Sequence, residues 1–165
     1  MTQLEIQLGH VDARHPGKCL SFTLTLRNSS ETRLVLPYPD ITDLRFRSCT
    51  TGDVSEWYTD SFVSSEGAAL VLEASTSRVF KLDARFQDVN VEMLPHEFSE
   101  FQRWCVDLPI GEYTAWYTFV VSDDYFDGDS HWRIGDLERE AAAHDAVVWK
   151  GQVFSNAITV VRRPT

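Results

Sequence analysis

The sequence is poor in cysteine, in basic residues and in long apolar runs, and each shortage excludes a class of protein. Its 165 residues include 3 cysteines with no Cys-x-x-Cys pair, which argues against a disulfide scaffold or a structural zinc site. The 15 Lys and Arg stand against 25 Asp and Glu, a net charge of −10, so nucleic acid and anionic membranes are unfavourable partners. A membrane-spanning helix needs about 20 apolar residues in succession, and the longest apolar runs here are a few residues.

The start of the chain and its cysteines predict where the protein resides. The segment MTQLEIQL contains neither the basic stretch nor the apolar stretch of a signal peptide, so we expect a cytoplasmic protein. A reducing compartment keeps thiols free, which predicts that Cys19, Cys49 and Cys105 are unbridged. One disulfide with a leftover thiol is the alternative.

What the sequence does contain is apolar residues at every second position, the period of a β-strand. Four inward-facing residues are predicted in 18–27: Leu20, Phe22, Leu24 and Leu26. The segment 112–122 is apolar on one face and partly apolar on the other, which is typical of a central strand. Further strands are predicted over 34–36, 44–47, 54–58, 78–86 and 104–108. The segments 147–149 and 157–162 are predicted to form either a last strand pair or one long bulged strand. About eight strands in a chain of this length predict one all-β domain over 1–165, a sandwich or a barrel.

The segment LPIGEY at 108–113 is similar to the E–F corner of immunoglobulin-like domains. In that corner Gly111 would take a backbone conformation that a β-branched residue resists. The hydroxyl of Tyr113 would form a hydrogen bond with backbone upstream, as in a tyrosine corner.

A longer resemblance covers about two-thirds of the chain. The segments LTLRNSS (24–30), DLRFR (43–47) and VSEWYTDSF (54–62) resemble bacterial immunoglobulin-like domains of the intracellular proteinase inhibitor type. The segment WKGQVFSNAITV (149–160) is similar to the last hairpin of bacterial immunoglobulin-like domains. The resemblance implies an immunoglobulin-like antiparallel β-sandwich. It implies fold more than activity, because such sandwiches serve many functions.

Residues 123–145 form an acidic insertion before the last strand. They contain eight acidic and two basic residues, a net charge of −6, and exceed the usual hairpin loop of about 2–5 residues. A short helix is predicted within them, with Asp136 as the N-cap residue and 141–143 as its continuation.

Apolar side chains among these charges are typical of a partner-binding surface with an aromatic anchor and a polar rim. The predicted surface consists of Asp123, Asp124, Phe126, Asp127, Asp129, Trp132 and Ile134. Trp132 is the tryptophan we expect to be most exposed, and clustered acids would steer a basic partner. The alternative is a solubilising flap whose aromatic side chains fold back onto the sandwich.

Motifs for metal binding and for catalysis are incomplete or absent in this sequence. His10, Asp12 and His15 are of zinc-ligating types, predicted to share one turn, but their spacing matches no zinc pattern. The stretch 123–132 fails the EF-hand rule because Tyr125 and Ile134 stand where carboxylates are required, so a solvated loop is favoured over an irregular calcium site. Since the sequence has no GxSxG, P-loop or GxGxxG motif, no catalytic, cofactor-binding or metal-binding residues are predicted.

These observations favour a non-enzymatic module that binds another protein, to which a basic surface would be complementary. The first alternative, implied by the resemblance, is an intracellular proteinase inhibitor. The second is a metal-dependent or hydrolytic enzyme, which would be favoured by a polar pocket holding two or more convergent histidines or carboxylates.

Overall fold

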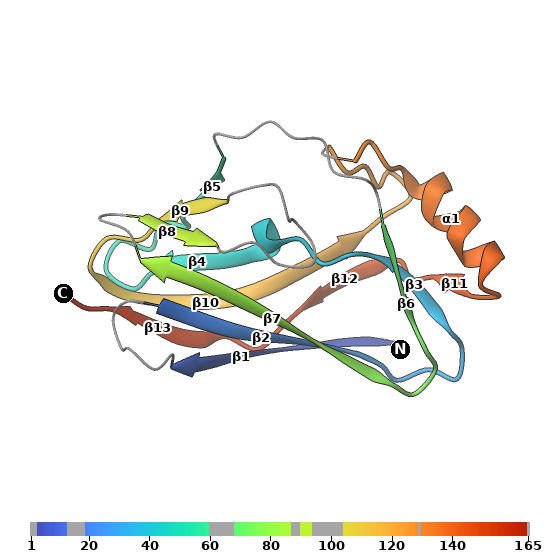
Figure 1. Cartoon of the computed structure of the whole chain (residues 1–165), viewed down its shortest axis with the longest axis horizontal. Helices are drawn as coiled ribbons and strands as arrows, with labels where there is room; N and C mark the ends of the chain where they lie inside the picture. The colour runs from blue at the N-terminus through green and yellow to red at the C-terminus, as the bar shows by residue number, and fades with distance from the viewer. Residues whose placement is uncertain are drawn as a thin grey trace.

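A computed structural model describes residues 3–12, 19–59, 68–86, 90–93, 104–128 and 130–164. Its largest sheet has six strands in the order β1-β2-β7-β8-β9-β5, and every neighbouring pair is antiparallel. The bounds are β1 Leu4–Asp12, β2 Cys19–Asn28, β5 Trp57–Tyr58, β7 Ser77–Phe86, β8 Asn90–Met93 and β9 Cys105–Asp107. The long strands β1, β2 and β7 cross one side of the molecule together (Figure 1).

The second sheet is built around β10 (Gly111–Val121), the longest described strand. On one edge β10 pairs with β4 (Leu44–Ser48), and on the other with β13 (Ile158–Arg162) and β12 (Gly151–Phe154). Phe154 lies opposite Thr118 and Ile158 opposite Ala115, so β12 and β13 form one edge strand with a bulge. The hairpin expected within 149–160 is therefore wrong, because its two arms lie end to end along β10.

The bulge joins the two sheets at their edges. The hydroxyl of Ser155 accepts a hydrogen bond from the backbone N–H of Tyr117 at 2.8 Å. The side-chain amide of Asn156 accepts from the N–H of Leu8 in β1 at 2.8 Å and donates to its carbonyl at 2.9 Å. Asn156 thus occupies two backbone groups on the edge of β1 that would otherwise be open to another strand.

The third sheet lies at one end of the molecule, beside the only described α-helix, α1 (Ile134–Ala143) (Figure 1). Its order is β11-β3-β6, with bounds β3 Leu34–Pro37, β6 Ala69–Leu72 and β11 Val147–Val148. The β3–β6 pair is antiparallel, whereas β11 runs parallel to β3. The expectation of an entirely antiparallel fold is wrong at this pair, because the helix returns the chain in the direction of β3.

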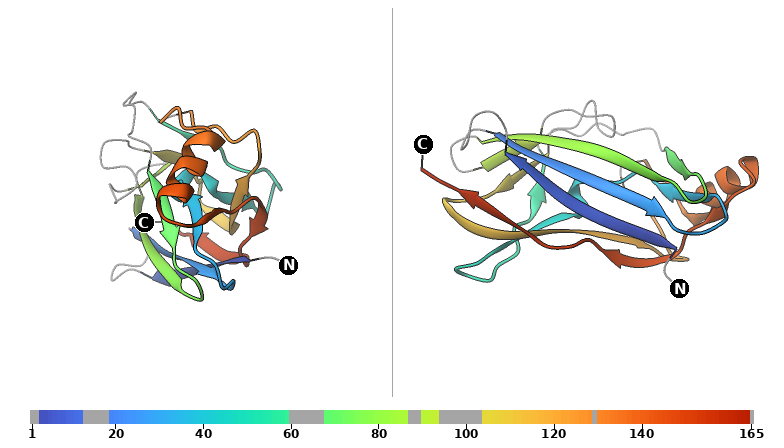
Figure 2. Two further views of the ribbon diagram at one scale, coloured as in Figure 1. Left: turned by 90° about the vertical axis from the view of Figure 1, so that its right-hand side faces the viewer. Right: turned by 90° about the horizontal axis from the view of Figure 1, so that it is seen from below.

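The core lies between the six-stranded and four-stranded sheets, which face each other in Figure 2. The rings of Phe22 on β2 and Phe46 on β4 meet edge to face, 6.0 Å apart. Leu24 and Leu26 are fully buried with Phe22, which confirms the predicted inward face of this strand. The side chain of Leu20 lies outside the described residues. The inward face of β10 is also as predicted: Tyr113, Ala115, Tyr117, Phe119 and Val121 are all buried.

The predicted corner contact is present at the start of β10. The hydroxyl of Tyr113 donates to the carbonyl of Pro109, four residues upstream, at 2.6 Å. Gly111 between them has a φ of +157°. This bond ties the beginning of β10 to the turn that precedes it.

Several strands were not predicted, or were predicted with different bounds. The strands β1, β6 and β8 had no counterpart, and of the predicted strand at 54–58 only Trp57–Tyr58 is strand. The pair β12 and β13 corresponds to the bulged last strand, one of the two alternatives predicted for the end of the chain. His10 and Asp12 lie on β1, so the turn expected to gather them with His15 is wrong. His15 itself lies outside the described residues.

Candidate functional site

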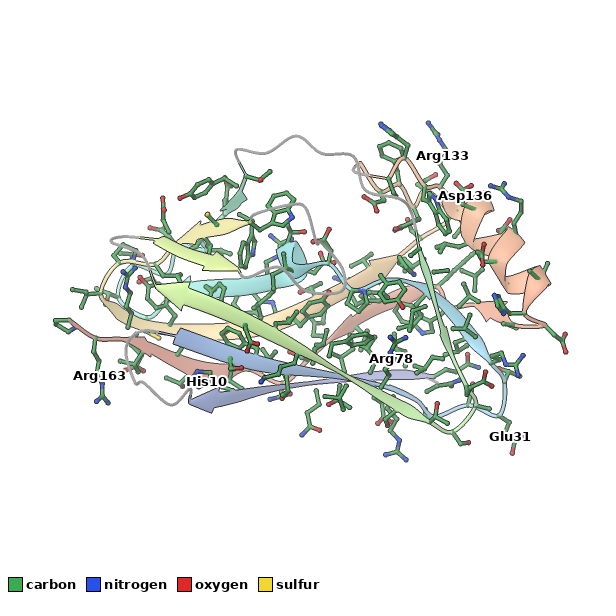
Figure 3. The ribbon with its side chains drawn as sticks, in the orientation of Figure 1. His10, Glu31, Arg78, Arg133, Asp136 and Arg163 are labelled. Atoms are coloured by element: carbon green, nitrogen blue, oxygen red, sulfur yellow. The ribbon has the colours of Figure 1, made fainter. Side chains whose placement is uncertain are left out.

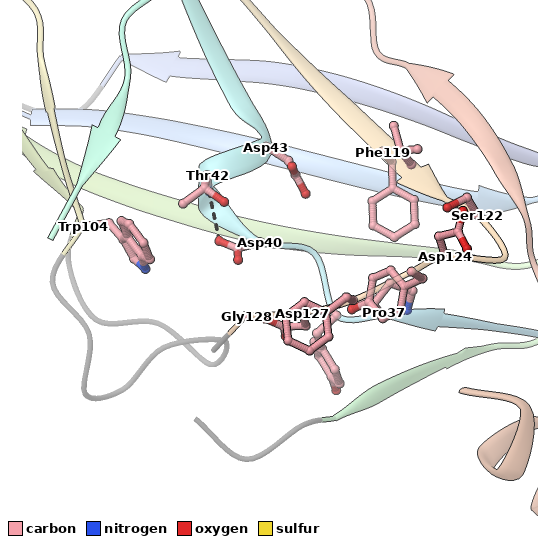
Figure 4. A pocket seen from close by; sticks show the side chains of 14 residues that line it. Pro37, Asp40, Thr42, Asp43, Trp104, Phe119, Ser122, Asp124, Asp127 and Gly128 are labelled. Atoms are coloured by element: carbon pink, nitrogen blue, oxygen red, sulfur yellow. Dashed lines mark hydrogen bonds between the residues drawn. The ribbon is translucent and has the colours of Figure 1, made fainter. Parts of the chain in front are cut away.

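A cavity of about 480 Å³ opens where three segments meet: the 3-10 helix η1 (Ile41–Asp43), the end of β10 and the segment 122–128 (Figure 4). Four carboxylic acids line it: Asp40, Asp43, Asp124 and Asp127. Five aromatic side chains join them: Tyr38, Trp104, Phe119, Tyr125 and Phe126. We call this the acidic cavity. Among the described residues that line it, none is basic.

The pairing of β4 with β10 explains why these segments converge. Leu44, which follows η1, lies opposite Tyr117. Because the two strands are antiparallel, η1 is placed beside the last residues of β10 and the segment that follows them. The acidic insertion therefore begins next to a second pair of acids, 80 positions earlier in the chain.

Local hydrogen bonds hold η1 in place. The carboxylate of Asp40 accepts from the N–H of Thr42 at 3.0 Å, a helix N-cap that Figure 4 shows as a dashed line. The fully buried Tyr117 donates its hydroxyl to the carbonyl of Asp40 at 2.7 Å. Ile41, inside η1, is buried in the core. Asp43 is consequently carried by a turn that is fixed at both of its faces.

The segment 122–128 is also folded on itself. The N–H of Tyr125 donates to the carbonyl of Ser122 at 3.1 Å, and that of Asp127 donates to the carbonyl of Trp132 at 2.9 Å. The carboxylate of Asp127 accepts from the hydroxyl of Ser130 at 2.8 Å. These bonds keep the backbone of the segment against the strand end while Phe126 stays 52% exposed.

The pKa shifts indicate that the acids of η1 and those of the segment 122–128 are close enough to influence one another. Burial, reinforced by the charges of Asp40 and Asp127 and opposed by Arg45, raises the pKa of Asp43 to about 7. Burial and the charges of Asp127, Asp40 and Asp43 likewise raise the pKa of Tyr125. Near neutral pH, Asp43 is thus a mixture of acid and carboxylate, whereas an ordinary aspartate is fully ionised.

The predicted partner surface divides in the structure. Asp124, Phe126 and Asp127 line the acidic cavity. Asp123 instead forms an exposed ion pair with Lys150 at 2.7 Å, and the pKa of its carboxyl is lowered by that hydrogen bond and charge. The remaining predicted members do not line the cavity: Trp132 and Ile134 pack half-buried against the core, and Asp129 lies outside the described residues.

The expectation of an exposed Trp132 is wrong, and Phe126 is the exposed aromatic of this region. The guanidinium of Arg133 lies 5.2 Å from the centre of the Phe126 ring, and the ring of His131 lies 6.2 Å from it. The rim of the cavity therefore already holds one cation over an aromatic face.

The predicted helix is present, but Asp136 is not its N-cap. The helix begins at Ile134, after Arg133 as N-cap residue (Figure 3). The carboxylate of Asp136, in the first turn, accepts from the backbone N–H of Arg133 at 2.7 Å, which is the reciprocal half of a capping box. Leu137 and Ala141 are the buried residues of this helix and attach it to the core.

The histidine, cysteine and acidic residues considered in the sequence form no further candidate site in the described residues. No group of three or more His, Cys, Asp or Glu residues that could hold a metal ion is found in the described parts of the chain. Neither Cys49 nor Cys105 is in a disulfide, and the thiol of Cys19 lies outside the described residues. Asp40, Asp43 and Trp104 were not predicted as site residues, although two acids flanking a short turn beside Pro37 and Pro39 could have marked η1.

Comparison of the chain with models of known families, with curated proteins and with solved structures gives no match in any of the three. In the described residues no helix is both long enough and apolar enough to cross a membrane.

Proposed function

We propose that the protein is a non-enzymatic binding module that receives a cationic side chain of a partner protein in the acidic cavity. One observation carries the proposal: the charged residues that line the cavity in the described chain are all acidic, and aromatic side chains stand beside them. Carboxylates form charge-assisted hydrogen bonds with guanidinium and ammonium groups, and aromatic faces attract the same cations.

The volume of the acidic cavity and the net negative charge of the protein both suit a cationic ligand. A volume of about 480 Å³ lies within the range of about 300–1,000 Å³ that is common for ligand sites, so an arginine or lysine side chain with part of its backbone fits. The net charge of −10 would steer a basic partner toward the protein and make association faster at low salt.

We further propose that the fold is an immunoglobulin-like sandwich. The bond from Tyr113 to Pro109 and the edge-to-face contact of Phe22 with Phe46 across the core support it. The third sheet and its parallel β3–β11 pair are additions at one end. A cytoplasmic location and a bacterial origin belong to the same proposal.

The proposed function can be tested with short fluorescent peptides that differ at one side chain. We expect a peptide with one arginine between glycines to bind, and its citrulline counterpart, which has the same shape without the charge, to bind at least tenfold more weakly. The double variant Asp124→Asn/Asp127→Asn should lose this discrimination. The matched control is Asp53→Asn, an exposed aspartate in the 51–53 turn that does not line the cavity. Equal affinity of the two peptides for the natural protein would overturn the proposal.

A second function is favoured by one specific observation, the raised pKa of Asp43 next to the carboxylates of Asp40 and Asp127. A carboxylic acid that stays protonated beside ionised carboxylates is the arrangement used in acid–base hydrolysis, including glycoside hydrolysis. The cavity also satisfies the criterion of convergent carboxylates. Turnover of chromogenic glycosides by the natural protein, abolished by Asp43→Asn and retained by Asp53→Asn, would favour the enzyme over the binding module.

A further inference from the structure

We propose that Asp43 is a proton-controlled gate of the acidic cavity, which holds a cation tightly when this carboxyl group is ionised and weakly when it is protonated. The inference rests on the proposed function and adds its regulation.

The gate depends first on where Asp43 is held. It ends η1, whose other residues are fastened by the bond from Tyr117 to the carbonyl of Asp40 and by burial of Ile41. Asp43 is half-buried and lines the cavity. Its charge is therefore placed at the wall of the cavity.

The gate depends next on the groups that face Asp43 from each packed element. Asp40 on η1 and Asp127 on the segment 122–128 oppose its ionisation, and Arg45 on β4 favours it. Tyr117 on β10 and Tyr125 face the same charge, and their hydroxyl groups are neutral at ordinary pH. The one cation among these groups is outweighed by burial and two carboxylates.

A cation that enters the cavity would act on Asp43 as Arg45 does. It would favour the ionised form and expel the proton, and by linkage the ionised form would favour the cation. Binding and proton release are then two sides of one equilibrium. The exposed Asp124 contributes charge but no gate, since its carboxyl group is not buried.

The expected size of the effect follows from the midpoint. With a pKa of about 7, Asp43 is ionised in about one molecule in eleven at pH 6 and in about ten of eleven at pH 8. If the ionised form is the binding-competent one, the apparent dissociation constant should be about tenfold larger at pH 6 than at pH 8.

The test measures binding of the single-arginine peptide to the full chain by calorimetry between pH 6 and pH 8. We expect the tenfold change in the natural protein and release of about half a proton per peptide bound near pH 7. Asp43→Asn should bind with an affinity that does not change over this range. Asp53→Asn should keep the change, and so should His131→Gln, which removes the ring that lies beside Phe126 at the rim of the cavity.

The possible outcomes distinguish failure of the gate at Asp43 from failure of the proposed binding function. Binding that is independent of pH, or a pH dependence that survives in a folded Asp43→Asn variant, overturns the gate and leaves the binding module. Absence of arginine-peptide binding at every pH overturns both. Should Asp43→Asn fail to fold, proton release by the natural protein decides: its absence in buffers of different ionisation enthalpy overturns the gate.

Discussion

The inner face of β10 and the segment 122–128 are neighbours in sequence and similarly rich in aromatic residues, yet they use them in opposite ways. On β10 Tyr113 and Tyr117 are buried, and both hydroxyls donate to backbone carbonyls. In the following segment Tyr125 is half-buried beside carboxylates and Phe126 is exposed. Aromatic content alone therefore does not separate core from site. What separates them is whether each ring has a partner surface on all sides.

The contrast between buried and exposed side chains is tested most directly at Tyr117. We expect Tyr117→Ala to lower the free energy of unfolding by about 3–5 kcal/mol, because it leaves a large cavity in a fully packed core. Val120→Ala, on the exposed face of the same strand, should cost less than about 1 kcal/mol. Urea unfolding followed by tryptophan fluorescence measures both. Similar losses for the two variants would contradict the assignment of the faces.

The second prediction concerns how Asp43 makes the stability of the folded protein depend on pH. Its pKa is about 7 in the folded protein and near its ordinary value of 3.8 in the unfolded chain, so the folded state holds the proton more tightly. The stability due to this group is fully present below pH 3.8 and is lost as the pH rises through 7.

Asn mimics the protonated acid, so Asp43→Asn should stabilise the protein at pH 8 by about 2–4 kcal/mol, given 1.36 kcal/mol for each unit of pKa. The gain should shrink steadily as the pH is lowered toward 4. Unfolding curves recorded across this range check the sign and the slope. A gain that is the same at every pH would point to packing rather than charge.

Strand alternation predicted the strands that carry most of the core. In β2, β7 and β10 a run of alternate described side chains is buried, so a period of two is visible in the sequence. β1 shows the same alternation at Leu4, Ile6 and Leu8, although no strand is predicted there. The strands β6 and β8 have four residues each, which is too short for a period to stand out.

Half of the acidic cavity could be predicted from sequence and half could not. Asp124, Phe126 and Asp127 belong to one segment, whose charge and length marked it. Asp40 and Asp43 join them only because the register of β4 on β10 brings η1 to the same end of the sheet. That register is a tertiary property, and no local pattern around η1 records it. Trp132 was predicted to be exposed from its charged neighbours, but the fold of the segment turns its ring inward.

The third prediction compares the two tyrosine hydroxyls. Tyr117→Phe removes the bond to the carbonyl of Asp40, which keeps the N–H of Asp43 as a donor, so the cost should be that of one hydrogen bond, about 1–1.5 kcal/mol. Tyr113→Phe removes the bond to Pro109 at a less buried site and should cost about 0.5–1 kcal/mol. Only the first loosens η1, so only Tyr117→Phe should weaken binding of the arginine peptide. Equal peptide affinity in the two variants would show that η1 is held without this bond.

The smallest effect on stability is expected at Phe126, where a binding effect should remain. Because the ring is 52% exposed, Phe126→Ala should change the free energy of unfolding by no more than about 0.5 kcal/mol. The same change removes an aromatic wall of the acidic cavity, and an exposed cation–π contact is worth about 0.5–1 kcal/mol, so the arginine peptide should bind about two- to fivefold more weakly. Phe154→Ala is the matched control: its ring is 57% exposed on β12 and does not line the cavity. If both variants bind the peptide as the natural protein does, Phe126 is an exposed ring without a role in the site. If both weaken binding equally, the peptide is held by general surface hydrophobicity, and the ring that lines the cavity is no different from an exposed ring elsewhere.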